Sequence, residues 1–299
     1  MSKLTVAILA PTGMLGSMVY KELKSRYNLI LVYRNARKLA KLYRSYGRGD
    51  TRTKAVRFDF AWLLEDYLTG FEKKPMAPET KKIMPALSRA DFIINCAGIT
   101  KPRSLLNPTV TMFVNGFLPL MLGKLYREKL IQIATDCVYN GLIGAPYAET
   151  ALKSPNDLYG LTKSIGEPEE SLVLRTSIIG PQIDGADLLL EWFKKQRRTT
   201  VSGFTNHRWN GITTKQFARV CDQIMTNRSR YPKKGLFHIY GSTLTKYEML
   251  KQFEQKYRRK VIVQPVKAPV SVDRRLTSRY DFNMKLHIPD FDTMLAELE

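Results

Sequence analysis

Residues 4–16, LTVAILAPTGMLG, join an apolar run to a turn that contains glycine and to the start of an amphipathic segment. The run Leu4–Leu9 is typical of a strand buried on both faces of a sheet. Gly13 and Gly16 follow it, and the apolar residues of Met14–Arg26 recur at helical spacing. A plain strand–helix turn gives this pattern too. Its place at the start of the chain favours a βαβ unit whose turn and helix N-terminus bind a pyrophosphate.

The same alternation continues through the first half of the chain. Further strands are expected at Asn28–Tyr33, Ala55–Phe58, Asp91–Asn95, Leu130–Ala134 and Leu172–Arg175. Helices are expected from Ala36 onward, over Thr111–Glu128 and over Asp157–Glu167. Buried strands that alternate with helices are typical of a parallel sheet covered on both faces. We therefore predict an α/β fold with a Rossmann-type, doubly wound parallel sheet, which binds its ligands at the carboxyl ends of the strands.

Beyond Gly180 the pattern loosens, and turn residues separate shorter helical segments. These helices are expected at Ala186–Gln196, Thr214–Thr226 and Lys246–Tyr257. We predict an NAD(P)-binding Rossmann domain over residues 1–180. A smaller, mixed α/β substrate-binding region is expected over residues 181–299, and the two can exchange segments.

Charge and composition narrow the function classes. The 299 residues contain 48 Lys and Arg against 27 Asp and Glu, a net charge of +21 that attracts anions. Nucleic-acid binding, ligands with diphosphates and a generally basic surface are three explanations. Nucleic acid is not expected, because no aromatic residues interleave with the basic clusters. No apolar run approaches the roughly 20 residues that cross a bilayer, so we predict a cytoplasmic protein without a membrane partner.

The cysteines and histidines point to neither disulfides nor a metal. The three cysteines and three histidines are scattered along the sequence, without a CxxC pair. Disulfide frameworks and metal sites both need clustered residues. We expect no metal.

The end of the second predicted strand bears on the choice of cofactor. Arg34 stands there, followed by Arg37 and Lys38, and no acidic residue occurs from Asn28 to Ala40. A carboxylate at this point binds the ribose hydroxyl of NAD, whereas arginine accommodates the 2′-phosphate of NADP. The pattern favours NADP(H), with NAD(H) as the alternative. A basic helix start that faces water would look the same.

Further cofactor contacts are expected at the neighbouring strand ends. Asp59 and Phe60 follow the third predicted strand, where an adenine ring would lie, although Asp also forms turns. Small residues after the fourth predicted strand leave room beside a nicotinamide, and Cys96 is better explained as a small core residue than as a nucleophile. The predicted cofactor contacts, with the catalytic pair described next, are Gly13, Met14, Leu15, Arg34, Asp59, Phe60, Cys96, Ala97, Gly98, Tyr159 and Lys163.

Tyr159 and Lys163 are the strongest candidates for catalysis. Four residues apart on a predicted helix, they share one face. A phenol has a pKa of about 10, and an adjacent ammonium is expected to lower it toward the working pH. Thr135, at the end of the fifth predicted strand, can hydrogen-bond the substrate oxygen. Reduction of a carbonyl needs such an acid beside a hydride donor, although a surface Tyr/Lys pair remains the simpler alternative.

Several segments together resemble a known family along nearly the whole chain. They are TGMLG (12–16), INCAG (94–98), VN (114–115), ATDCVYNG (134–141), YGLTKSIGE (159–167), RTSIIG (175–180), WNGITT (209–214) and DRRL (273–276). With them the sequence resembles the extended short-chain dehydrogenases/reductases. More narrowly, it is similar to the dTDP-4-dehydrorhamnose reductase branch. It departs from the family at Ala10, where a glycine is usual, and an alanine fits there only if its φ is negative.

The resemblance implies reduction of a nucleotide-linked 4-keto-6-deoxy sugar at C4, with NADPH as hydride donor and Tyr159 as proton donor. Thr135, Tyr159 and Lys163 would be the catalytic set. Thr100, Thr135, Asp136, Trp209 and Arg274 would face the substrate, Arg274 and Arg275 being candidates for its diphosphate. A core anchor is the alternative for Trp209, and surface charge for the two arginines.

The family leaves two further functions open. One is another nucleotide-sugar epimerase or reductase of the same superfamily, and the other is a non-catalytic regulatory subunit that binds the cofactor. A homodimer is a further expectation.

Overall fold

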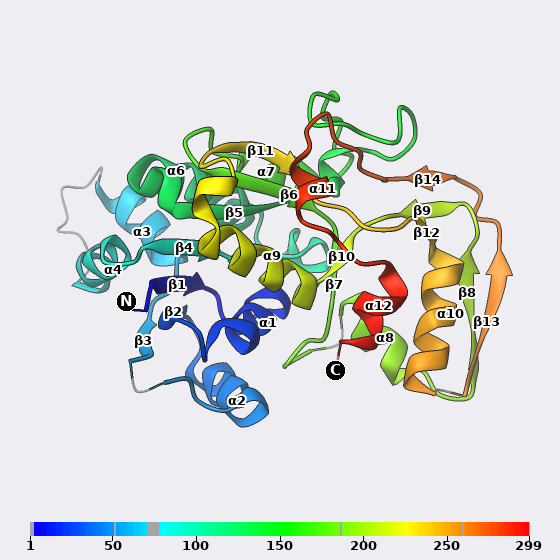
Figure 1. Cartoon of the computed structure of the whole chain (residues 1–299), viewed down its shortest axis with the longest axis horizontal. Helices are drawn as coiled ribbons and strands as arrows, with labels where there is room; N and C mark the ends of the chain where they lie inside the picture. Colours follow the sequence, from blue (N-terminus) through cyan, green and yellow to red (C-terminus); the bar gives the residue numbers. More distant parts are fainter. Residues whose placement is uncertain (1–2, 51, 71–77, 186, 259, 299) are drawn as a thin grey trace.

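The computed structural model describes residues 3–50, 52–70, 78–185, 187–258 and 260–298. Its largest feature is a parallel sheet of seven described strands in the order β11-β6-β5-β4-β1-β2-β3 (Figure 1). The strands are β1 Thr5–Leu9, β2 Asn28–Tyr33, β3 Lys54–Arg57, β4 Phe92–Asn95, β5 Leu130–Thr135, β6 Leu172–Thr176 and β11 Gly235–His238. The predicted doubly wound α/β fold is confirmed.

Alternating side chains of the strands fill two cores, one on each face of the sheet. Val6 and Ile8 of β1 belong to one core, and Ala7 and Leu9 to the other. The first core packs under α1 Met14–Leu23, α2 Ala36–Tyr46 and α9 Thr214–Thr226. The second face carries α3 Ala61–Gly70, α4 Pro78–Ser88, α5 Pro108–Met112, α6 Leu118–Tyr126 and α7 Leu158–Ile165 (Figure 1). Helices on both faces explain why the inner strands β1, β2 and β4 are almost entirely apolar.

The predicted helix Thr111–Glu128 is interrupted in the structure. A π-helical turn, Phe113–Phe117, separates α5 from α6. Pro119 has no N–H to give to the carbonyl of Asn115, so a regular α-helix cannot continue through this point. Such π turns are frequent at functional sites. The turn contains the buried Asn115.

The C-terminal part forms a smaller layer beside the carboxyl edge of the sheet (Figure 1). Its strand groups are β8 Thr199–Phe204 with β13 Val261–Val266, β9 His207–Trp209 with β12 Leu244–Thr245 and β14 Val272–Asp273, and β7 Ile178–Ile179 with β10 Ile212–Thr213. Its helices are α8 Leu189–Lys195, α10 Lys246–Tyr257 and α12 Phe291–Ala296, while α11 Phe282–Lys285 packs against β11 of the main sheet (Figure 1). The predicted bounds of α9 and α10 are confirmed. The predicted helix Ala186–Gln196 begins only at Leu189, and Ala186 itself lies outside the described residues.

Segments from beyond residue 180 return to the main sheet. Strand β11 pairs with β6, and α9 packs against α1. The chain thus crosses several times between the sheet and the C-terminal layer. Residues far apart in the sequence meet at this boundary, where the candidate site lies.

Candidate active site

The turn between β1 and α1 is tight. A Cβ atom on Gly16 would lie 2.2 Å from the carbonyl oxygen of Ala10, so only glycine fits there. Gly13 is the N-cap of α1 and makes no side-chain cap. A Cβ on Gly13 would meet its nearest neighbour, the Ala10 oxygen, at an ordinary 3.6 Å. The fold alone therefore does not require glycine at position 13, and the N-terminus of α1 is a position at which an anionic group can bind.

Ala10 does not have the negative φ that an alanine was expected to need. Its φ is +55°, in the left-handed region. An L-residue with a Cβ adopts that region at a cost of roughly 1–2 kcal/mol. The Ala10 amide donates to the Val32 carbonyl at 2.9 Å, and the Ala10 carbonyl accepts from Gly13 at 3.2 Å, which holds the residue in this conformation.

Arg34 and Asp59 meet at the ends of β2 and β3. Arg34 Nε lies 3.8 Å from Asp59 Oδ2, and the Arg34 side chain is largely exposed. Asp59 Oδ1 also accepts a hydrogen bond from the Ala61 amide at the start of α3, so the alternative of a turn-forming Asp holds as well. The Phe60 ring is buried, edge-on to Phe58 at 5.4 Å, which leaves mainly its backbone to contact a cofactor.

The basic start of α2 is partly engaged by another segment. Asn35 caps the helix through the Lys38 amide, and Lys38 Nζ lies 3.4 Å from Asp184. Arg34 and Arg37 are exposed at this edge of the sheet. Of the predicted 2′-phosphate contacts, these two arginines are therefore better available than Lys38.

Cys96, Ala97 and Gly98 follow β4 and are supported by an asparagine that sequence reasoning did not select. Asn115 accepts from the Ile99 amide at 2.8 Å, donates back to the Ile99 carbonyl at 3.0 Å and reaches Thr162 Oγ1 at 3.3 Å. It links the loop after β4 to α7. In the sequence, Asn115 appears only as part of the family motif VN (114–115). Burial raises the pKa of the Cys96 thiol, which supports a core role over a nucleophilic one.

Thr135 and Tyr159 are brought together by close packing of α7. Asp157 caps this helix by accepting from the Gly160 amide at 2.7 Å. A Cβ on Gly160 would lie 2.3 Å from the Cys137 carbonyl, so the helix packs directly on the turn after β5. That turn carries Thr135, whose Oγ1 accepts from the Cys137 amide and donates to Asp136 Oδ1, both at 3.2 Å.

The pKa of Tyr159 is raised, and the expectation that Lys163 lowers it is wrong. Burial is the main cause, and the neighbouring Cys137 and Asp136 add to it, while the hydrogen bond from Thr135 opposes it. The Lys163 ammonium instead donates to the Ile133 carbonyl at 2.9 Å. Burial lowers the pKa of Lys163 to about 8, against the attraction of Glu167. The phenol is thus held in its neutral form, which can donate a proton.

A buried ion pair secures the end of α7 to the sheet. Arg175 on β6 and Glu167 after α7 have side chains only 1% and 5% exposed. Arg175 Nε and Nη2 donate to the two carboxylate oxygens at 3.0 and 2.8 Å, and Nη1 donates to Tyr139 Oη at 2.6 Å. This forked geometry fixes the helix that carries Tyr159 and Lys163.

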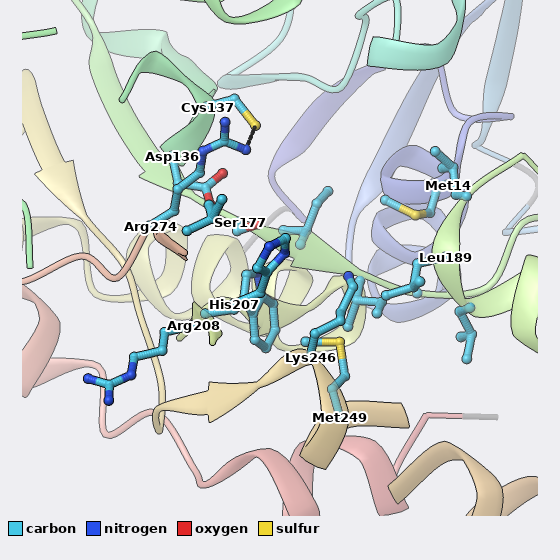
Figure 2. A pocket seen from close by; sticks show the side chains of 17 residues that line it. Met14, Asp136, Cys137, Ser177, Leu189, His207, Arg208, Lys246, Met249 and Arg274 are labelled. Carbon is cyan, nitrogen blue, oxygen red and sulfur yellow. Dashed lines mark hydrogen bonds between the residues drawn. The ribbon is translucent and has the colours of Figure 1, made fainter. Parts of the chain in front are cut away.

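A cavity of about 320 Å³ lies between the carboxyl edge of the sheet and the C-terminal layer (Figure 2). Both parts of the chain line it. Among the predicted site residues it brings together Met14, Asp136, Trp209 and Arg274. The predicted catalytic set Thr135, Tyr159 and Lys163 does not line it, and neither does Thr100. Thr100 precedes the 3-10 turn Lys101–Arg103, where Lys101 pairs with Asp157 at 2.8 Å.

Trp209 lines the cavity and also packs edge-on against Phe291 at 5.3 Å, so its contact with a substrate stays a prediction. Arg274 lines the cavity, but its guanidinium is bound to the loop after β5. Its Nε donates to the Tyr139 carbonyl at 3.1 Å, and its Nη1 lies 3.8 Å from Cys137 Sγ. Arg275 forms a forked pair with Asp273 at 2.7–3.0 Å, which favours the surface-charge alternative for it.

Two absences apply to the described residues. No group of three His, Cys, Asp or Glu side chains there could hold a metal ion. In the same ranges, no helix combines the length and the apolar character that a bilayer span needs.

Comparison with known proteins identifies relatives of two kinds. The chain is 32% identical over 100 residues to a dTDP-4-keto-6-deoxy-D-glucose reductase of Streptomyces niveus, a match that covers 30% of this chain and 35% of that protein. It is 27% identical over 258 residues to the methionine adenosyltransferase 2 subunit beta of Xenopus tropicalis, which covers 81% of this chain and 69% of that one. The chain thus spans only about a third of the first relative.

The fold is similar to that of solved structures, among them a dTDP-4-dehydrorhamnose reductase. The dTDP-4-dehydrorhamnose reductase of Bacillus anthracis, in complex with NADP, superposes with a TM-score of 0.66 at 16% identity and 98% coverage of both chains. The family described as RmlD substrate binding domain matches residues 77–291, which is most of the sequence. The chain therefore belongs to the RmlD substrate-binding domain family.

Proposed function

We propose that this protein is an NADPH-dependent reductase that acts at C4 of a nucleotide-linked 4-keto-6-deoxy sugar. The main support is the contact of Thr135 with the half-buried Tyr159 at the carboxyl end of β5, where α7 packs directly on the turn that follows this strand. Beside them, the cavity is lined by the sheet edge and by the C-terminal layer. The reductase of Streptomyces niveus and the NADP complex of the Bacillus anthracis protein agree with this choice.

The nicotinamide cofactor, when bound, supplies the hydride that reaches C4. The open N-terminus of α1 at Gly13 would receive its diphosphate, and Arg34 with Arg37 would receive a 2′-phosphate. Thr135, whose hydroxyl donates to Asp136 in the structure, would turn that proton to the ketone oxygen and orient it. Tyr159 then gives its proton to that oxygen, so that the ketone becomes a hydroxyl group. The Lys163 ammonium is held on the Ile133 carbonyl at 2.9 Å, from where it would contact the cofactor.

Consumption of NADPH tests the proposal directly. Purified protein is incubated with NADPH and a 4-keto-6-deoxy sugar nucleotide, and absorbance at the nicotinamide band is followed. Tyr159→Phe should lower turnover by about 10²–10⁴-fold, the usual contribution of a general acid, and leave NADPH binding intact. Tyr280→Phe changes an exposed tyrosine and is the matched control. Equal rates in the unsubstituted protein and in Tyr159→Phe would refute the role of the phenol.

A second candidate is a cofactor-binding subunit without turnover of its own. The match to methionine adenosyltransferase 2 subunit beta favours it, because that match covers far more of the chain than the reductase match. This function predicts NADPH binding, no oxidation of NADPH with dTDP-, UDP- or GDP-linked keto sugars, and co-purification with another enzyme. Turnover on any of these sugars that depends on Tyr159 would exclude it.

A further inference from the structure

Lys246 lies at the first position of α10 and extends into the cavity (Figure 2). A capping box fixes this end of the helix: Thr245 Oγ1 accepts from the Glu248 amide at 3.2 Å, and Glu248 accepts from the Thr245 amide at 2.6 Å. The backbone that carries Lys246 is therefore held in place. With the backbone fixed in this way, the Lys246 side chain is directed into the cavity.

The other basic side chains of the cavity are engaged by other groups or turned away. Arg274 donates to the backbone of residues 139 and 140. Arg208 is exposed and points away from the other lining side chains (Figure 2). His207 Nε2 lies 3.1 Å from the Val270 carbonyl. Within the described ranges, Lys246 Nζ has no hydrogen bond and no carboxylate within 4.0 Å. The N–H groups of this ammonium are therefore available to a ligand.

The surroundings make an unpaired ammonium costly at this position. Burial lowers the pKa of Lys246 to about 8, and the more distant Asp136 only partly opposes this. Asp136 has its own partners in Thr135, Ser177 and Arg274. A cation that is kept partly desolvated without a counter-ion reduces the stability of the fold. The cost is offset when an anion enters the cavity.

We propose that Lys246 is the anion-recognition residue of this cavity and that the ligand supplies its counter-ion. The anionic group is either the diphosphate of a nucleotide sugar or a carboxylate on the sugar ring. This inference rests on the proposed function only in taking the ligand to be a nucleotide sugar. It does not depend on turnover.

Calorimetric titration with UDP, dTDP, UDP-glucose and UDP-glucuronate tests the inference and separates the two anions. Lys246→Met is compared with Lys251→Met, a lysine of the same helix that pairs with Glu254 on the surface. Loss of one charge-assisted contact should weaken binding by about 10- to 100-fold. If Lys246 meets the diphosphate, all probes that bind lose affinity equally. If it meets a sugar carboxylate, only UDP-glucuronate does. Lys246→Arg, which keeps the charge, should recover most of the loss.

Thermal unfolding without ligand gives a readout that a structural lysine would not produce. Lys246→Met should melt at a higher temperature than the unsubstituted protein, because an unpaired cation has been removed, and Lys251→Met should melt within about 1 °C of it. If Lys246 instead stabilised the fold, Lys246→Met would melt at a lower temperature than the unsubstituted protein. The inference is overturned if Lys246→Met binds every probe as tightly as Lys251→Met does, or if the unsubstituted protein binds none of the four. Neither result requires any measurement of reduction.

Discussion

Replacing each glycine of the first turn by alanine should affect a different property: Gly16→Ala should lower stability, and Gly13→Ala should lower NADPH affinity. In Gly16→Ala the new Cβ would lie 2.2 Å from the Ala10 oxygen and 2.9 Å from Pro11 Cα. Carbon–oxygen contacts normally begin at about 3.3 Å, so the turn and α1 must separate by about 1 Å. Overpacking of this kind costs about 1–3 kcal/mol, and both obstacles are backbone atoms that cannot rotate away, which favours the upper end.

Helix propensity acts in the opposite direction. Alanine inside a helix is favoured over glycine by about 1 kcal/mol, which leaves a net loss of about 2 kcal/mol for Gly16→Ala. In Gly13→Ala the nearest contact is 3.6 Å, so the fold should lose at most about 1 kcal/mol, the cost of alanine at an N-cap. The new methyl group would instead fill the space that we assign to the cofactor diphosphate.

Urea unfolding and NADPH titration, followed by the fluorescence of the cofactor, separate the two effects. Gly16→Ala should unfold at a lower urea concentration and bind NADPH weakly, because the amides of α1 have moved. Gly13→Ala should unfold close to the unsubstituted protein and still lose NADPH affinity. Normal NADPH binding by Gly13→Ala would contradict the assignment of this turn. Unchanged stability of Gly16→Ala would contradict the packing argument.

Three further outcomes are expected. Ala10→Gly should raise the melting temperature, since glycine adopts a φ of +55° without the strain of a Cβ, and a lower value would refute the strained turn. Glu167→Gln should cost about 3–5 kcal/mol in chemical unfolding, because it leaves Arg175 charged and buried without its partner; a loss below 1 kcal/mol would argue against it. Lys163 has a folded pKa of about 8, below the ordinary 10.5, so the folded state binds fewer protons than the unfolded state between these values and stability rises with pH there. Relative to Lys163→Met, the unsubstituted protein should therefore gain on the order of 2 kcal/mol from pH 8 to pH 10, and parallel urea curves would exclude this.

Much of the fold could be predicted because its signals are local. The apolar runs of β1 and β2 and the helical spacing of α9 and α10 lie within a few residues of each other in the sequence. Burial on both faces favours apolar residues at most positions of a parallel strand, and that preference can be seen without the structure. The interruption at residues 113–117 was missed because it depends on one proline and on packing against α7.

The candidate site could be predicted only in part. Thr135, Tyr159 and Lys163 were selected from spacing and resemblance, yet the direction of the Tyr159 pKa was wrong, because burial is a tertiary property. Asn115 was missed as a site residue, since its partner Ile99 lies in a different element. Lys246 had no sequence signal at all.

The sequence by itself determined the strand and helix pattern, the glycine turn and the order of the family motifs. These depend on side-chain size, polarity and backbone freedom at neighbouring positions. Only the tertiary structure decided the φ of Ala10, the partners of Arg274 and the unpaired state of Lys246. The physical reason is that burial, hydrogen-bond partners and electrostatic neighbours come from residues that are distant in the chain, and folding alone brings them together.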